Sequence, residues 1–439
     1  MSEPARRRAR DETPGPPSFD TVEGVERRLA RPHADPFLHA PDDLAALAPG
    51  AVVRSRRVEL GFMGVVKQRH LQAWQVAYRS NDLHGEPEVA VTTVVVPRGH
   101  RPGEPARLVA YQCAIDAISD RCFPSYALRA GARSWGALPQ FELMIIAALV
   151  GHGYVVTIAD HEGRGGRFGA PREPGHRVLD AVRATTAFAP VGLPEDTPVG
   201  LIGYSGGGMA TAWAAEMAPT YAPELDLVGA VLGSPVGDPG EAFLKLNAGP
   251  FAGLPAMVVA GLRDAYPGLA RVIKQHTRLE GQRRLDALHR MTTTGAVIRY
   301  AFDDFDDYLD TPLADVLATP EVLEVFNDLR LGGRIPTCPL LVLQSTHDQI
   351  IDIDDIDLQV ERYAAGGADV LYLRDRLSDH ISLMVLGLPT MLGWLERRFE
   401  GHEPATGTRT VTSLALAPRT WPGFVRMAAA ATRTLTGRA

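Results

Sequence analysis

A serine set among glycines, between an apolar run and an alanine-rich run, is the feature of this sequence best suited to chemistry. The segment reads Gly203, Tyr204, Ser205, Gly206 and Gly207. Apolar Val199–Ile202 precedes it and Met209–Met217 follows, which predicts a strand that turns sharply into a helix around Ser205. Side chains at Gly203 and Gly207 would clash in that turn. The pattern predicts a nucleophilic serine at a helix N-terminus, where free N–H groups favour a developing oxyanion. A glycine-rich structural turn is the alternative.

A nucleophilic serine needs a histidine to take its proton and a carboxylate to orient that histidine. In a fold with a strand-to-helix serine turn, the chain order is serine, acid, histidine. Asp348 follows the predicted strand Pro339–Leu343, at the carboxyl end of a strand where active sites gather. His380 follows the predicted strand Val370–Leu373 by a short loop. We therefore predict that Ser205, Asp348 and His380 act together.

Other residues compete for the two supporting roles. The rival acids are Asp352, Asp354 and Asp355, for which a charged loop or a helix N-cap is the alternative interpretation. The remaining histidines near or after the serine are predicted to be surface or structural residues: His276, His289, His347 and His402.

The elements around these residues predict an α/β fold with a mostly parallel central sheet flanked by helices. Three β-branched or aromatic runs come first and predict an antiparallel meander: Ala51–Val53, Leu71–Tyr78 and Val89–Val96. Buried strands, the first of them Leu108–Gln112, then alternate with amphipathic helices, as parallel neighbours joined by crossovers require. A helix predicted over Ile381–Phe399 closes the domain. Residues 237–320 lack strands, which predicts a helical cap inserted into a domain spanning 37–400. Its apolar residues could line an acyl pocket or simply pack the cap: Phe243, Leu244, Phe251, Met257 and Val258.

The two ends of the chain are expected to lie outside this domain. Residues 1–36 are rich in Arg, Pro and Glu and predict a flexible arm, and residues 401–439 predict a tail. Within that tail, Trp421, Phe424 and Val425 could make transient contact with a lipid surface. No apolar segment follows the basic N-terminus and no apolar run reaches about eighteen residues. As written, the chain is expected to be cytoplasmic and to have no transmembrane segment.

The composition of the chain further limits which partners, disulfides and cofactors are expected. The 439 residues carry a net charge of -7, which disfavours nucleic acid as a partner. Three cysteines allow at most one disulfide and are expected to be small core residues. The chemistry of a serine nucleophile needs no metal and no organic cofactor, so neither is expected.

The sequence resembles the secretory lipase family that includes Candida antarctica lipase A and actinobacterial members. The shared stretches cover about 40–400 in order: Tyr111-Gln112, Phe123-Pro124-Ser125-Tyr126, Asp160-His161-Glu162-Gly163, the Ser205 segment, Tyr221-Ala222-Pro223-Glu224-Leu225 and Gly249-Pro250-Phe251-Ala252-Gly253. The resemblance implies a serine lipase or esterase of the α/β-hydrolase fold, with a helical cap inserted after the sixth strand. It places the triad on the same three residues.

The resemblance also implies roles that the motifs alone leave open. It assigns Asp116 as the second oxyanion-hole residue beside Gly206, and Asp160–Gly163 as structural supports of the pocket. Members of the family are commonly exported and carry disulfides, whereas no cysteine lies between Cys122 and Cys338 here. The expected reaction is hydrolysis of a small-molecule ester or lipid through an acyl-enzyme on Ser205. The alternatives are a serine peptidase of the same fold and a catalytically silent binding protein.

Overall fold

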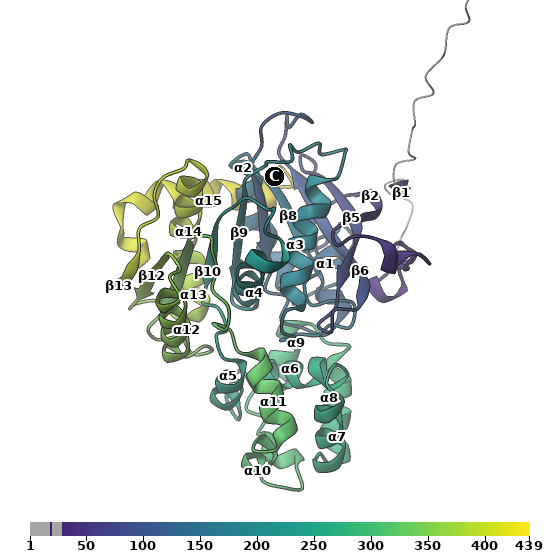
Figure 1. The fold of residues 1–439 in the computed structure, drawn as a ribbon. Helices are drawn as coiled ribbons and strands as arrows, with labels where there is room; N and C mark the ends of the chain where they lie inside the picture. Colours follow the sequence, from purple (N-terminus) through teal and green to yellow (C-terminus); the bar gives the residue numbers. More distant parts are fainter. Residues whose placement is uncertain (1–17, 20–28) are drawn as a thin grey trace, which may run out of the picture.

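The structure is a computed structural model that describes residues 18–19 and 29–439, and its centre is one large twisted sheet (Figure 1). Eleven described strands lie side by side in the order β1-β2-β5-β6-β8-β7-β9-β10-β11-β12-β13. In that order their bounds are Ser18–Phe19, Val52–Val58, Gln72–Asn81, Pro87–Val96, Val155–Ala159, Leu108–Gln112, Val199–Tyr204, Leu227–Gly233, Leu340–Ser345, Val370–Asp375 and Gly407–Val411.

The sheet changes from antiparallel to parallel along this order. β5 runs antiparallel to both β2 and β6, as the predicted meander requires, and β6 is antiparallel to β8. From β8 to β13 all neighbours are parallel. All residues of β7, β8 and β9 are buried, because helices cover both faces of the parallel part. The carboxyl ends of these strands therefore meet at one edge.

Helices form a layer on each face of the sheet (Figure 1). α3 (Glu173–Thr186) and α4 (Gly206–Tyr221) pack on each other and on β8, β9 and β10. α2 (Pro139–Gly151) contacts β8 and α14 (Leu388–Phe399) contacts β10, while α12 (Ile353–Ala365) contacts β11 and β12. The helix predicted over 381–399 is two helices, because Gly387 separates α13 (His380–Leu386) from α14.

A group of helices between β10 and β11 stands beyond the edge of the sheet at the lower end of Figure 1 and is called the cap. Its helices are α5 (Pro239–Leu246), α6 (Gly253–Arg263), α7 (Pro267–His276), α8 (Leu279–Leu288), α9 (Thr293–Arg299), η5 (Phe305–Tyr308), α10 (Leu313–Leu317) and α11 (Pro320–Leu329). The strand-free region thus reaches Leu329, past the expected boundary at 320.

The C-terminal residues differ from the tail expected over 401–439. β13 pairs in parallel with β12 and extends the sheet, and α15 (Trp421–Leu435) packs on α2 and α14. The pattern was missed because four of the five residues of β13 are exposed, so no alternation of apolar and polar residues marks it. Trp421 and Val425 stay exposed on the outer face of α15.

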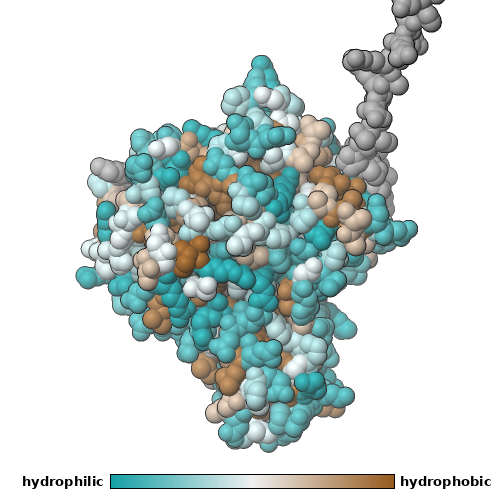
Figure 2. Space-filling model, in the orientation of Figure 1, coloured by the Kyte–Doolittle hydropathy of each residue, from teal (hydrophilic) through white to brown (hydrophobic). Residues whose placement is uncertain are grey.

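Most of the arm expected over 1–36 lies outside the described residues. Its described end, from Leu29, packs on the body: Pro32 is buried and His33 hydrogen-bonds to Asp120. The visible surface is mainly hydrophilic, with hydrophobic atoms in small separate groups (Figure 2). Among residues 18–19 and 29–439, no helix has the length and apolarity needed to cross a membrane.

Candidate active site

Ser205 lies at the sharp turn between β9 and α4. Its backbone angles are φ 54° and ψ −124°, a strained combination that a non-glycine residue adopts only where its surroundings enforce it. The turn lifts the hydroxyl from the sheet, and Gly206, the next residue, opens α4. The backbone N–H of Gly206 has no acceptor within the helix, because the first N–H groups of any helix lack one.

The glycines around the serine are explained by contacts. A Cβ atom on Gly203 would overlap the carbonyl of Gly207, and one on Gly207 would overlap the carbonyl of Gln112 on β7. A Cβ atom on Gly206 would collide with the carboxyl group of Asp116. The strand, the turn and the neighbouring loop can approach this closely only without side chains.

His380 and Asp348 reach the serine from two other strand ends. The Nε2 atom of His380 lies 2.9 Å from the Ser205 hydroxyl, and its Nδ1 atom lies 2.7 Å from Oδ2 of Asp348. Because Nδ1–H donates to the carboxylate, Nε2 is left as the acceptor for the serine proton. The three side chains, 175 residues apart at their extremes, are brought together in the arrangement of a proton relay.

The carboxylate of Asp348 is fixed by further hydrogen bonds. Its Oδ1 accepts from the backbone N–H groups of Ile350 and Ile351, both at 2.8 Å, and its Oδ2 also accepts from Gln344. The side chain is fully buried. Lys245 of the cap donates to the backbone carbonyl of Asp348 at 2.9 Å, which ties the cap to the loop that carries the acid.

The rival acids and histidines lie elsewhere. Asp352 is the N-cap of α12, where it accepts from the backbone N–H of Asp354, and Asp355 lies in the first turn of that helix. His276 faces Asp310 and His402 faces Glu400. None of these side chains is bonded to Ser205.

Asp375 supports the histidine and was missed by sequence reasoning. This buried carboxylate at the end of β12 accepts from the backbone N–H groups of Leu377 and Ser378, in the loop that leads to His380. It also accepts from Leu414 in the C-terminal segment. The stretch Arg374-Asp375-Arg376 has the composition of an ordinary surface loop, so no signal in the sequence singled out its carboxylate.

The loop of residues 113–117 faces the serine from the end of β7. Asp116 has a positive φ of 45°, and its backbone N–H donates to Glu162 at 3.0 Å. Glu142 accepts from the backbone N–H of Ala114, and His161 donates to the carbonyl of Cys113. Oδ1 of Asp116 is buried and has no hydrogen-bond partner among the described residues.

Burial changes the ionisation of these loop supports. It raises the pKa of Asp116 to about 7, helped by the negative charge of Glu142, and raises the pKa of Glu142 to about 7. The pKa of Glu162 is likewise well above its usual range. Burial lowers the pKa of His161 to about 4, so this histidine is neutral at pH 7. The carboxyl of Asp116 thus holds a proton well above the pH at which an exposed aspartate loses it.

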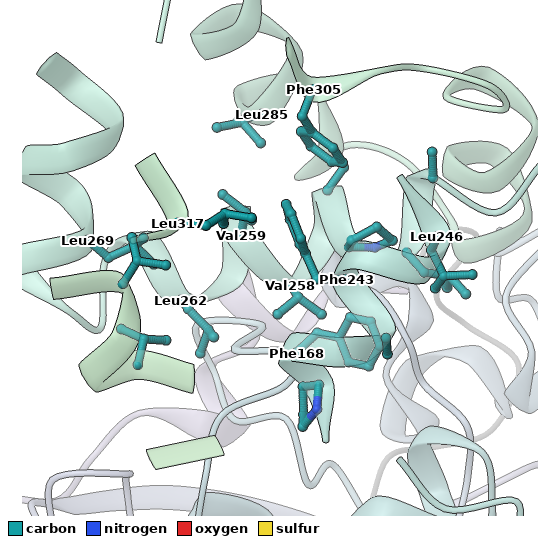
Figure 3. Close-up of a pocket in the computed structure, with 18 of the residues that line it drawn as sticks. Phe168, Phe243, Leu246, Val258, Val259, Leu262, Leu269, Leu285, Phe305 and Leu317 are labelled. Carbon is teal, nitrogen blue, oxygen red and sulfur yellow. The ribbon is translucent and has the colours of Figure 1, made fainter. Parts of the chain in front are cut away.

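A cavity runs from the serine into the cap (Figure 3). Ser205, Gly206 and Asp116 line one end, and the walls are mostly aliphatic and aromatic side chains of the cap. Of the five cap residues considered as pocket walls, Phe243 and Val258 line the cavity. Leu244 is exposed, Met257 is buried in the core, and Phe251 is half-buried and packs against the core. An apolar channel that ends at a polar group suits a substrate with a long apolar part.

The described residues contain no group of three or more His, Cys, Asp or Glu side chains placed to hold a metal ion. The three cysteines are buried and free, consistent with small core residues.

The large mixed sheet, the turn at the carboxyl end of β9 and the inserted cap define an α/β-hydrolase fold. The sequence profile of the family described as secretory lipase matches residues 128–407. The structure of Candida antarctica lipase A superposes with a TM-score of 0.82 at 27% identity, covering 92% of this chain and 95% of that one.

Two curated relatives match most of the chain. The chain is 50% identical to "Probable inactive lipase MT1628" of Mycobacterium tuberculosis, over 97% of this chain and 95% of the relative. It is 32% identical to "Secreted triacylglycerol lipase LIP4" of Malassezia globosa, over 87% of this chain and 84% of the relative. This chain belongs to the secretory lipase family. The cytoplasmic location expected from the N-terminal residues finds no support in that membership.

Proposed function

We propose that this protein is a serine carboxylic-ester hydrolase, a lipase or esterase that works through an acyl-enzyme on Ser205. The observation that carries the proposal is the continuous hydrogen-bonded path from the Ser205 hydroxyl through His380 to the buried Asp348. Each side chain has the partner that its role requires, and the serine lies at the end of an apolar cavity.

In the first step, His380 Nε2 takes the hydroxyl proton as Ser205 Oγ attacks the ester carbonyl. The carbonyl oxygen becomes an oxyanion, and the imidazolium is stabilised by Asp348. The tetrahedral intermediate collapses, the C–O bond to the alcohol breaks, and His380 returns the proton to the departing alcohol. Water activated by the same histidine then releases the acid and restores the serine.

The oxyanion needs two donors, and we assign them to Gly206 and Asp116. The Gly206 backbone N–H is free at the start of α4. The backbone N–H of Asp116 is already bonded to Glu162, so the donor from Asp116 would be its protonated carboxyl group. The absence of a hydrogen-bond partner for Oδ1 among the described residues, its approach to Gly206 and its raised pKa favour that assignment.

The name of the 50%-identical relative favours a second candidate, a binding protein that has lost catalysis. Labelling with a fluorophosphonate separates the two functions, because only an activated serine is modified. We expect the wild type to be labelled and to hydrolyse nitrophenyl esters, and Ser205→Ala to do neither. Full turnover by Ser205→Ala would contradict the assignment of the nucleophile. A wild type that is neither labelled nor active would favour the binding protein.

A further inference from the structure

The wall of the cavity contains an ion pair that no step of the proposed reaction uses. Among the described residues that line the cavity, three have acidic or basic side chains: Asp116 beside the serine, and Arg284 and Asp303 in the cap. Arg284 lies on α8 and pairs with Asp303, which follows α9. An ion pair in the wall of an otherwise apolar channel needs a reason, because its desolvation opposes its attraction.

The chain neighbours of Arg284 and Asp303 lie across the cavity from the side chain that approaches the nucleophile. Phe168 approaches Gly206 next to the nucleophile, and Figure 3 shows Phe168 at one side of the cavity, with Leu285 and Phe305 at the opposite side. Arg284 adjoins Leu285 in the chain, and Asp303 is two residues before Phe305. The side chains of Arg284 and Asp303 are 19% and 21% exposed, so the pair stands between the apolar interior and water.

The guanidinium of Arg284 is held in place by its neighbours. It lies between the rings of Tyr300 and Tyr308, 4.7 and 4.8 Å from their centroids, and the Tyr300 hydroxyl donates to the Arg284 carbonyl. The backbone of Asp303 is anchored too, since its carbonyl accepts from Ala248 and its N–H donates to Tyr300. The ring contacts and the ion pair together hold the Arg284 guanidinium in one position, unlike the mobile charge of an exposed arginine.

We propose that the Arg284–Asp303 pair ends the part of the cavity that an acyl chain can occupy, and so sets the longest acyl chain that the site accommodates. We call this pair the stop. The inference rests on the proposed function of this cavity as the acyl site of an ester hydrolase. Each methylene buried along the apolar walls gains about fourfold in affinity. An acyl chain that reaches the pair gains no further affinity with length. Its next methylene would have to displace a charged group, which hydrocarbon cannot solvate.

The test measures binding, so that it does not depend on turnover. In the Ser205→Ala background, methyl esters from butyrate to palmitate compete with a fluorescent alkyl ester for the cavity. We compare this parent with Arg284→Met/Asp303→Asn, which removes both charges at similar volume. The matched control is Arg263→Met/Asp286→Asn, because Arg263 and Asp286 form a 2.8 Å pair that also involves α8 but do not line the cavity.

For the parent and the control we expect affinity to rise with chain length and level off at the same length. In Arg284→Met/Asp303→Asn, the stop variant, the rise should continue for at least two more methylenes, a gain of about sixteenfold for the longest esters. Arg284→Lys, which keeps the pair, should level off with the parent. Levelling at the parent's length in the stop variant, or an equal extension in the control, would overturn the proposal.

Further measurements distinguish the proposed hydrolase function from the proposed limit on acyl-chain length. If the double variant does not fold, Arg284→Met alone removes the guanidinium and leaves Asp303 partly in water, with the same expected extension. With Ser205 restored, hydrolysis of the same esters should show the same limits. A protein that binds esters with these limits but cleaves none would refute the hydrolase and retain the stop, whereas failure to bind any ester would refute both.

Discussion

The candidate site has two parts that differ in polarity. Its floor, formed by Ser205, His380, Asp348 and the 113–117 loop, is polar, whereas the cavity walls in the cap are mostly apolar. On the floor, buried polar groups form directional hydrogen bonds: Asp348 accepts four, and Glu142, His161 and Glu162 each bond to the backbone of the 113–117 loop. In the cap, aromatic contacts such as Phe243 with Phe305 and Phe326 fill the space. Directional hydrogen bonds thus fix the positions of the side chains in the candidate site, whereas non-directional packing sets the shape of the cavity.

The largest loss of activity should follow from replacing one carboxylate oxygen of Asp348 by an amide nitrogen. Asp348→Asn keeps an oxygen for the N–H groups of Ile350 and Ile351 but turns an amide N–H₂ toward His380 Nδ1. The imidazole would then hold the wrong tautomer, and we expect kcat to fall by about 10⁴-fold with little change in KM. Steady-state kinetics on a nitrophenyl butyrate measure this, and a loss below tenfold would remove Asp348 from the relay.

Asp116 should show the next largest effect. Asp116→Ala removes the proposed second donor, and we expect kcat to fall by about a hundredfold to a thousandfold. In the wild type, kcat/KM should decline above about pH 7 as the carboxyl loses its proton. Asp116→Asn donates at every pH, so it should retain more activity than alanine and lack that alkaline decline. An unchanged pH profile in this variant would exclude the carboxyl as donor.

The same carboxyl should affect folding. The folded protein keeps the Asp116 proton up to about pH 7, whereas the unfolded chain releases it near 3.8. Between these values the folded state binds more protons, so this group makes stability fall as pH rises. Its contribution is at most about 4 kcal/mol. Urea unfolding at pH 5 and pH 7.5 should show a smaller decrease for Asp116→Asn than for the wild type, and equal decreases would contradict the buried-proton interpretation.

A substitution in the cap should act on substrate length and barely on chemistry. Phe243→Leu loses two aromatic contacts, worth about 1 kcal/mol each, and leaves the floor untouched. We expect kcat/KM for palmitate esters to change less than tenfold and that for acetate to stay unchanged. Ratios measured across an ester series check this. An equal loss for acetate would mean that the cap also positions the reacting groups.

The two regions also differ in how far sequence alone could predict them. Residues 108–112 were predicted as a strand with the bounds that β7 has, because an uninterrupted buried run between turns is a strong local signal. Ser205, Asp348 and His380 could be predicted to meet, as their hydrogen bonds in the structure show, because strand ends fix where such residues fall. The need for glycine at 203 follows from a local contact with Gly207, whereas Gly206 and Gly207 are packed against Asp116 and Gln112 from distant parts of the chain.

What the sequence did not reveal depends on contacts between distant residues. At Gly387, where the helix predicted over 381–399 divides, the packing leaves no room for a side chain, since a Cβ atom there would press on Leu343 and Leu383. Cap residues share one apolar composition, so nothing local distinguished Phe243, which lines the cavity, from Leu244, which faces water. Arg284 and Asp303 are 19 residues apart, and only tertiary structure pairs them.

The C-terminal strand has a consequence for any shortened form of this protein. The backbone N–H groups of Arg376 and Leu377, in the approach to His380, donate to the carbonyls of Val411 and Thr412. A chain ending near residue 400 would lose these acceptors together with the N–H of Leu414 that bonds to Asp375. It would retain Ser205 and Asp348 but lose the backbone contacts that support the loop before His380. The edge of β12 would then be unpaired, and an unpaired strand edge can pair with a neighbouring molecule.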